Sequence, residues 1–310
     1  MALVAGSGNV TGLGVIEALS QAQLGIDHFR LVAGYDCCEI EANAANMFCT
    51  NYKVPRASDP QYSSWVMMLV HDLHPQVIIP SNDHDLRVLL TFESELNAKG
   101  VILNGTCHNT TKFQDKLKTS YLFTDLGIQT PQLLSPTGYD YPYVVRKNRV
   151  GTGKKFSYMI RNNKDEANVP EDPSECVFTR LIEGQEYTID IVCSQKSDVL
   201  AVIPRLRRRV TAGIVTFAEV VKDDLIIKQA TDLAKKCQLR GINCVQCIRN
   251  DHGCFFFEVN PRPGSGTSLT TKAGVNMPEL WIQSLYGTVS HPEPKWGLKM
   301  VRYYAGHYFT

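Results

Sequence analysis

The 310-residue sequence lacks a long apolar run, an excess of charge of either sign and a typical export signal. Its apolar runs, such as WVMMLV, fall far short of the ~20 residues that span a bilayer. Lys and Arg number 32 against 31 Asp and Glu, so no general field attracts nucleic acid or an anionic membrane. The start, ALVAGSGNV, has no basic flank. We therefore expect a cytoplasmic protein with no nucleic-acid and no membrane partner.

Cysteine is not scarce, but its ten residues do not form a pattern typical of a disulfide scaffold. In a chain of this size without an export signal, we expect free, buried thiols. The one spacing that resembles a metal site is Cys244-x-x-Cys247. These two residues lie in a strand pattern three positions apart, so their side chains should point to opposite faces and cannot share a zinc ion.

Strand and helix patterns alternate along the first hundred residues. The strand patterns are at 2–6, 29–34, 76–80 and 100–105, and the helical patterns are at 10–22, 63–73 and 84–96. Strands separated by helices of about ten residues predict a parallel sheet with right-handed crossovers. We predict an α/β, Rossmann-like domain over residues 1–108.

From residue 109 the pattern changes to strands joined by hairpin-like turns. Strands are predicted at 141–147, 156–161, 176–182, 186–194, 199–208, 213–221, 241–250 and 254–260, with helices at 110–127 and 223–239. This pattern favours an antiparallel sheet. We predict an α+β domain over residues 109–310.

A glycine-rich turn follows the first strand, with the spacing Gly6-x-Gly8-x-x-x-Gly12. Asp36 ends the next strand, about where the ribose carboxylate of a dinucleotide site would lie. The spacing is one residue longer than the dinucleotide fingerprint. A nicotinamide site, a contact to a substrate carboxylate and a purely structural turn all remain open.

Two further stretches have the residue types of a nucleotide site. Arg146 and Lys147 end a strand that leads to Gly151 and Gly153, and glycine amides with nearby cations suit phosphate oxygens. A basic surface hairpin is the alternative. Glu186 begins a strand, where its carboxylate could accept both hydroxyls of a ribose or lie in solvent at a sheet edge.

The segment FFFEVNPRPGSG carries the most specific pattern. Glu258 and Asn260 are two apart on one strand and should share a face, and Gln246 on the neighbouring strand could converge on them. One carboxylate with neutral oxygens is a set that Mg²⁺ binds. Arg262 and a Gly-Ser loop follow, which suits an anion beside the metal. The alternative is a core glutamate followed by an Asn-Pro turn.

The stretch RLRRRV is a run of basic residues on a predicted strand. Alternation would place Arg205, Arg207 and Arg209 on one face. The run has no interleaved aromatic residues, so it does not indicate nucleic-acid binding. The run is either an anion clamp inside a cleft or a solvated basic edge. If it is an anion clamp, Arg209 is a catalytic candidate together with Arg262.

Taken together, these stretches resemble the ATP-grasp superfamily, in particular ligases similar to the large subunit of carbamoyl-phosphate synthase. The resemblance runs from residue 1 to about 290. The matching motifs are GLGVIEAL, IIPSND, FQDK, VVRK with GTG, IEGQEYTID, GINCVQ, FFFEVNPRPGSG and KAGVNMPEL. It implies a pre-ATP-grasp domain followed by a small lobe at about 113–180 and a large lobe at about 181–310, which clamp ATP between them.

The resemblance also implies a role for each matching residue. Lys116 and Arg146 would contact the ATP phosphates, the loop with Gly151 and Gly153 would cover them, and Glu186 would hold the ribose. Gln246, Glu258 and Asn260 would bind Mg²⁺ (or Mn²⁺), and Arg262 would steady the γ-phosphate and the acyl-phosphate intermediate. The sequence departs from the family at Arg146-Lys147, where Lys-Pro is usual, and at Thr179-Arg180, where an acidic pair is usual.

The activity that the resemblance implies is ATP-dependent ligation. ATP phosphorylates a carboxylic acid to an acyl phosphate, and an amine or similar nucleophile then displaces phosphate. Small-molecule acids and amines are the expected partners, and a homodimer is compatible with this interpretation. The alternatives are a nicotinamide-dependent oxidoreductase and a non-catalytic ATP-binding protein. The identities of the acid and the nucleophile are not encoded in any of these motifs.

Overall fold

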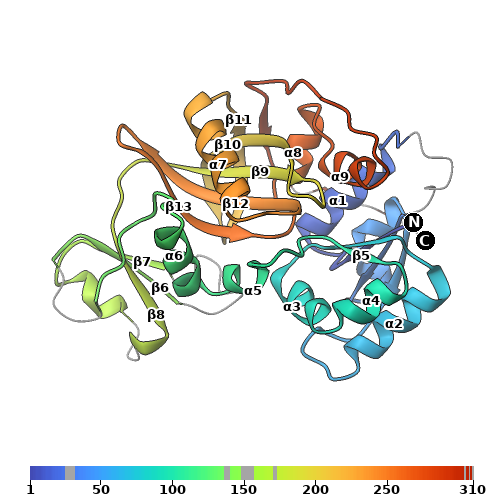
Figure 1. Cartoon of the computed structure of the whole chain (residues 1–310). Helices are drawn as coiled ribbons and strands as arrows, with labels where there is room; N and C mark the ends of the chain where they lie inside the picture. Colours follow the sequence, from blue (N-terminus) through green and yellow to red (C-terminus); the bar gives the residue numbers. More distant parts are fainter. Residues whose placement is uncertain are drawn as a thin grey trace.

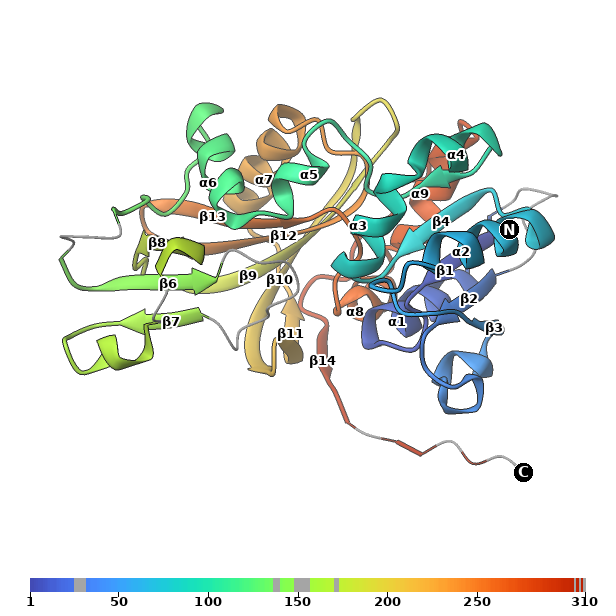
Figure 2. The ribbon, with the colours of Figure 1, turned by 90° about the horizontal axis from the view of Figure 1, so that it is seen from below.

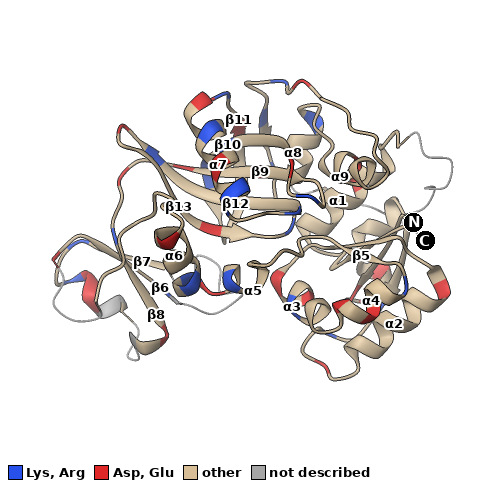
Figure 3. Ribbon diagram, viewed as in Figure 1, with Lys and Arg blue, Asp and Glu red and all other residues tan. Residues whose placement is uncertain are grey.

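The computed structural model describes residues 1–24, 32–135, 140–147, 157–169, 173–303, 305–306 and 308. Three sheets organise the chain (Figure 1). A five-stranded sheet lies in the N-terminal part, a six-stranded sheet in the C-terminal part, and a three-stranded sheet between them in sequence. Acidic and basic residues are interspersed over both parts (Figure 3). No helix among the described residues is both long and apolar enough to cross a bilayer.

The N-terminal sheet is parallel, with the strand order β3-β2-β1-β4-β5. Its strands are β1 (Ala2–Ala5), β2 (Val32–Asp36), β3 (Thr50–Lys53), β4 (Val77–Pro80) and β5 (Ile102–Leu103). Its helices are α1 (Val10–Ser20), η1 (Ile40–Ala42), η2 (Ala44–Met47), α2 (Tyr62–Leu73), α3 (Asp83–Thr91) and α4 (Glu93–Ala98). The α/β architecture predicted for this part is confirmed, although the single helix predicted over 84–96 is two helices that meet at Phe92.

The large sheet has the strand order β13-β12-β9-β10-β11-β14, and every neighbouring pair is antiparallel. Its strands are β9 (Gln185–Cys193), β10 (Val199–Thr211), β11 (Ile214–Val220), β12 (Gly241–Asn250), β13 (Gly253–Asn260) and β14 (Lys299–Val301). The small sheet has the order β7-β6-β8, formed by β6 (Tyr143–Lys147), β7 (Ser157–Ile160) and β8 (Cys176–Arg180). The strand β14 was not predicted.

Helices cover one face of the large sheet. The remaining helices within the described residues are α5 (Thr110–Phe113), α6 (Lys116–Asp125), η4 (Asp165–Asn168), η5 (Pro173–Glu175), α7 (Asp224–Lys236), α8 (Thr267–Lys272) and α9 (Met277–Leu285). Phe123 of α6 and Leu233 of α7 pack in one apolar cluster with Ile189 of β9 and Val245 of β12. Figure 2 shows α6 and α7 on one side of this sheet. On the opposite face, apolar residues such as Val192 and Ile242 pack in a cluster with α9, and side chains such as Thr188 and Gln246 form a polar face beyond them.

A second apolar cluster joins the two ends of the chain. Val15 and Ile16 of α1 pack in one cluster with Leu269 of α8 and Trp281 of α9, all of them nearly inaccessible to solvent. Asn276, which caps α9, also donates a hydrogen bond from Nδ2 to the carbonyl oxygen of Ala18, at 2.7 Å. The N-terminal sheet is thereby fixed against the large sheet, and its strand ends face the same space as the polar face.

Candidate active site

A cavity of about 1050 Å³ lies where the three sheets meet. Its walls come from the N-terminal part, from the small sheet and from the polar face of the large sheet; examples are Asn82, Arg146, Thr188 and Glu258. Single ligand sites usually measure about 300–1,000 Å³. The cavity therefore has room for a molecule the size of a nucleotide together with part of a second ligand.

Strand alternation makes the floor of this cavity polar. On β12, Val245 and Cys247 pack against the helices, while Cys244 and Gln246 line the cavity. The opposite orientations of Cys244 and Cys247 agree with the prediction. All ten cysteines are free thiols, as predicted, but only six of them are buried. Burial and the nearby Asp190 raise the pKa of the Cys244 thiol to about 11, so it is protonated at neutral pH.

Three candidate metal ligands meet on this floor. Gln246 lies directly opposite Glu258 on the neighbouring strand, and Asn260 donates from Nδ2 to Glu258 Oε1 at 3.2 Å. Among the described residues, Glu258 has no cation within ion-pair distance, although it lines the cavity. A carboxylate with two amide side chains fits Mg²⁺, which also keeps water or phosphate ligands. A bound magnesium ion would supply positive charge opposite transferring phosphate oxygens.

Arg146 faces this group from the small sheet. Its guanidinium is 5.3 Å from the centre of the Phe257 ring, and Nη1 donates to the Phe257 carbonyl oxygen at 3.5 Å. Arg146 is 7% exposed, and its Nε has no hydrogen-bond partner in the described part of the chain. Burial lowers the pKa of Arg146, and Glu258 raises it in part. A buried cation with an unused donor suits an anionic ligand.

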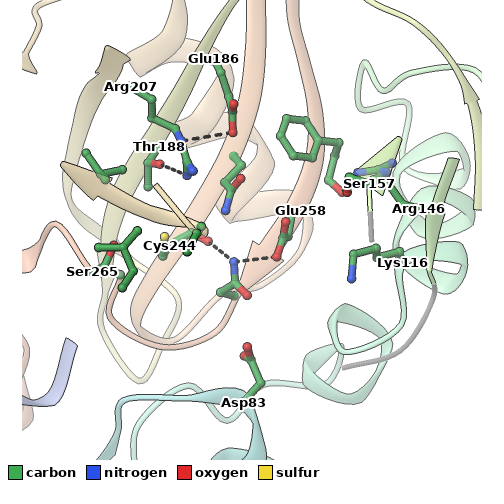
Figure 4. Close-up of a pocket in the computed structure, with 18 of the residues that line it drawn as sticks. Asp83, Lys116, Arg146, Ser157, Glu186, Thr188, Arg207, Cys244, Glu258 and Ser265 are labelled. Atoms are coloured by element: carbon green, nitrogen blue, oxygen red, sulfur yellow. Dashed lines mark hydrogen bonds and ion pairs between the residues drawn. The ribbon is translucent and has the colours of Figure 1, made fainter. Parts of the chain in front are cut away.

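Lys116 completes this side of the cavity. It is the first residue of α6, directly after Asp115, whose side chain caps the helix by accepting from the Lys118 amide at 2.9 Å. The structure thus divides the predicted helix 110–127 into α5 and α6. Figure 4 shows Lys116 and Arg146 on the same side of the cavity, with Glu258 facing them. The other two residues of the predicted phosphate cradle, Gly151 and Gly153, lie outside the described residues.

Arg262 is held by a carboxylate of the N-terminal part. Its Nε and Nη2 donate to the two oxygens of Asp83 at 2.9 and 2.7 Å, and Nη2 also donates to Asn260 Oδ1 at 3.2 Å. Burial raises the pKa of Asp83, but the charge and hydrogen bonds of Arg262, with the charges of Lys116 and His84, together lower it by more, so the net direction is downward. The planar pairing fixes the guanidinium beside the candidate metal ligands.

Glu186 also lines the cavity, and it forms an ion pair with an arginine. Its Oε1 is 3.2 Å from Nε of Arg207, whose Nη1 donates to Thr188 Oγ1 at 3.0 Å. Figure 4 shows these three side chains together, apart from Lys116 and Arg146. The position at one end of the cavity is compatible with a ribose contact, and Arg207 neutralises the carboxylate there.

The structure places Arg209 away from this site. Two register shifts in the pairing of β10 with β11 flank Arg209 and break the alternation that would have aligned it with Arg205 and Arg207. Arg209 is exposed, donates from Nε to Thr216 Oγ1 at 3.2 Å, and is not among the described residues that line the cavity. The prediction that the three arginines share one face of the strand is therefore wrong for Arg209.

Arg205 is almost completely buried. It pairs with Asp190 through two hydrogen bonds of 2.7 Å, and Thr270 donates to the same carboxylate. A Cβ on Gly266 would lie 1.7 Å from Nη1 of Arg205, so only glycine fits above this guanidinium. Neither Asp83 nor Asp190 was predicted as the partner of an arginine, although Asp83 follows a parallel strand, where ligand sites are frequent.

The carboxylate of Asp36 is hydrogen-bonded to the backbone at the glycine turn of the N-terminal part. Both oxygens of Asp36 already accept backbone hydrogen bonds, from Gly8 at 2.9 Å and from Cys38 at 3.1 Å. A Cβ on Gly12 would lie 2.2 Å from the Gly6 carbonyl oxygen, so close packing requires glycine at position 12. These contacts favour the structural explanation of the turn.

Comparisons with known proteins agree with this architecture. Residues 172–304 match the family described as ATP-grasp in the biosynthetic pathway with Ter operon. The ADP complex of N5-carboxyaminoimidazole ribonucleotide synthetase is similar, with a TM-score of 0.74 and 15% identity over 96% of this chain and 79% of that one. A biotin carboxylase complex from Campylobacter jejuni gives 0.72 and 12%, over 96% and 73%. An L-amino acid ligase from Bacillus licheniformis gives 0.68 and 17%, over 91% and 73%.

The fold is therefore that of the ATP-grasp proteins, as predicted, with a parallel α/β part followed by antiparallel sheets. The family match covers the large sheet and the segment that carries Gln246, Glu258 and Arg262.

Proposed function

We propose that this chain is an ATP- and Mg²⁺-dependent ligase that activates a carboxylic acid as an acyl phosphate for attack by an amine or a similar nucleophile. The observation that carries this proposal is Glu258. It is a cavity carboxylate with no cation within ion-pair distance among the described residues, and it lies opposite Gln246 and beside Asn260. Such a carboxylate is stabilised when a divalent cation binds.

The proposed roles follow the two sides of the cavity. Lys116 and Arg146 bind the phosphates, Glu186 contacts the ribose, and Gln246, Glu258 and Asn260 hold the metal. Phosphoryl transfer depends mainly on positioning and on neutralising charge, and the cavity supplies both without a nucleophilic side chain. Arg262, oriented by Asp83, faces the transferred group. The protonated thiol of Cys244 has no part in the chemistry.

The sequence motifs favour a carbon–nitrogen ligase similar to carbamoyl-phosphate synthase, with the pre-ATP-grasp domain at residues 1–108. We also infer a cytoplasmic location. The similar structures support nucleotide use, since two of them are complexes with ADP or with an ATP compound. Arg209 is not part of the proposed machinery.

Thermal melting with candidate ligands tests the proposal. Mg-ADP at a hundred times its Kd should stabilise the protein by about 2.7 kcal/mol. NADH should cause no shift, because the spacing of the glycine turn is one residue longer than the dinucleotide fingerprint and Gly12 packs against the Gly6 carbonyl oxygen. A panel of carboxylic acids and amines, assayed for ADP release, then identifies the substrates. A melting shift with NADH and none with Mg-ADP contradicts the proposal.

A further inference from the structure

A β-bulge in β13 turns two consecutive side chains toward the cavity. The pairing with β12 shifts between Gln246 and Cys247, and Phe257 is the extra residue that has no opposite partner on β12. Phe256 packs in the apolar cluster with α6 and α7, whereas Phe257 and Glu258 both line the cavity. The bulge therefore adds an aromatic side chain to the face that carries the candidate metal ligand.

The ring and the carbonyl group of Phe257 both contact Arg146, which extends from the small sheet. The guanidinium carbon of Arg146 lies over the ring, 5.3 Å from its centre, and cation–π contacts usually lie within about 6 Å. Nη1 of Arg146 also donates to the Phe257 carbonyl oxygen at 3.5 Å. Since Arg146 is only 7% exposed, water screens this attraction little. The bulged residue thus makes two direct contacts with the buried cation.

An aromatic ring holds a guanidinium in a different way from a carboxylate. A carboxylate in the same place would accept the N–H groups of Arg146 and compete with a phosphate for them. The face of the ring attracts the charge without an acceptor atom, and Nε of Arg146 has no hydrogen-bond partner among the described residues. Fixing a long side chain costs free energy when a ligand binds. A ring that fixes the guanidinium beforehand reduces that cost.

We propose that Phe257 is a positioning residue for Arg146: its ring, turned into the cavity by the bulge, holds the guanidinium where it binds the phosphates of the nucleotide. This inference rests on the proposed function, which supplies the nucleotide. Phe257 acts through Arg146 and has no part in the phosphoryl transfer. The contact also connects the small sheet with the strand of Glu258, so the phosphate-binding cation and the candidate metal ligand are placed by one irregularity of β13.

A double-mutant cycle on Mg-ADP binding, measured by calorimetry, tests this role. Phe257→Leu keeps an apolar side chain and removes the aromatic face, and we expect it to weaken binding about 2- to 30-fold, the ratio that corresponds to one cation–π contact. In the Arg146→Ala background the same substitution should have no effect, because no guanidinium is left to position. Phe257→Tyr keeps the ring face and should restore the wild-type Kd. The matched control is Phe255→Leu on the same strand, at a half-buried residue outside the described lining of the cavity, and it should leave the Kd unchanged.

A purely structural role of Phe257 predicts independent effects, so that Phe257→Leu weakens binding by the same factor with arginine or alanine at position 146. Equal factors in the two backgrounds overturn the positioning role, and so does an unchanged or tighter Kd of Phe257→Leu with arginine present. In both cases the wild type still binds Mg-ADP, and the ligase proposal stands. If the wild type does not bind Mg-ADP, the ligase proposal fails and the positioning role is overturned with it.

Discussion

Replacing Asp83 with asparagine removes the charge that orients Arg262. The pair has two hydrogen bonds of 2.9 and 2.7 Å, and the side chains of Arg262 and Asp83 are 16% and 21% exposed. Hydrogen bonds to charged groups contribute about 1.5–3 kcal/mol, and breaking a fully buried pair costs about 3–5 kcal/mol. Because this pair borders the cavity, we expect Asp83→Asn to lower the free energy of unfolding by about 2 kcal/mol.

The effect of Asp83→Asn should depend on pH in one direction. Arg262 holds the folded-state pKa of Asp83 below its ordinary value of 3.8, despite the opposing effect of burial. The stabilisation is therefore fully present above the pKa of the unfolded state and is lost as the pH falls through the folded-state pKa. The difference between wild type and variant should stay constant between about pH 5 and pH 8 and shrink in acid.

Urea unfolding at a series of pH values measures both quantities. The matched control is Asp72→Asn, at the exposed carboxylate that pairs with His71 in α2. That variant should change the free energy of unfolding by less than about 0.5 kcal/mol. Equal effects of Asp83→Asn and Asp72→Asn at neutral pH would show that the contact with Arg262 does not hold the two parts of the chain together.

Two further variants test the phosphate side and the glycine loop. Arg146→Ala should weaken Mg-ADP binding about 10- to 150-fold, which corresponds to about 1.5–3 kcal/mol for a charged donor. Arg146→Lys should weaken the binding less. Calorimetry measures the Kd of both variants, and an unchanged Kd for the alanine variant would show that Arg146 is not part of the site. Gly266→Ala should destabilise the protein by about 1–3 kcal/mol in urea, because its Cβ would overlap Arg205. The control is Gly14→Ala in α1, where a Cβ meets nothing nearer than 3.6 Å; equal stability of the two variants contradicts the packing argument.

Local strand geometry explains what the sequence predicts well. Side chains on a regular strand alternate, so Glu258 and Asn260 can be assigned to one face from their spacing alone. The position of Gln246 opposite Glu258 does not follow from the turn between β12 and β13, whose register would place Phe257 there; a register shift between Gln246 and Cys247 brings Glu258 into that position. The same alternation separates Cys244 from Cys247.

Interruptions of regular geometry explain what the sequence does not predict. No residue type near Arg209 predicts the irregular pairing of β10 with β11, and the alternation of side chains between the two faces of the strand is interrupted there. The break between α5 and α6 could have been predicted from the sequence, since aspartate, as at Asp115, is a frequent helix-capping residue.

Ion pairs between distant segments are also not encoded in local patterns. Asp83 and Arg262 are 179 positions apart, and their contact depends on how the N-terminal sheet packs on the large sheet. The partners of Arg205 and Arg207 depend on which strands become neighbours. Sequence periodicity alone therefore finds candidate charged groups without finding what neutralises them.

The Mg²⁺ dependence of ADP binding to Glu258→Gln tests the central claim most directly. Calorimetry with Mg²⁺ and with EDTA should show tighter ADP binding with Mg²⁺ for the wild type and for the exposed control Glu95→Gln. Glu258→Gln should lose that difference, because the side chain keeps its shape but loses the charge that would hold the metal. If Glu258→Gln melts lower yet keeps the full Mg²⁺ dependence, Glu258 is a structural carboxylate and the proposed metal site is wrong.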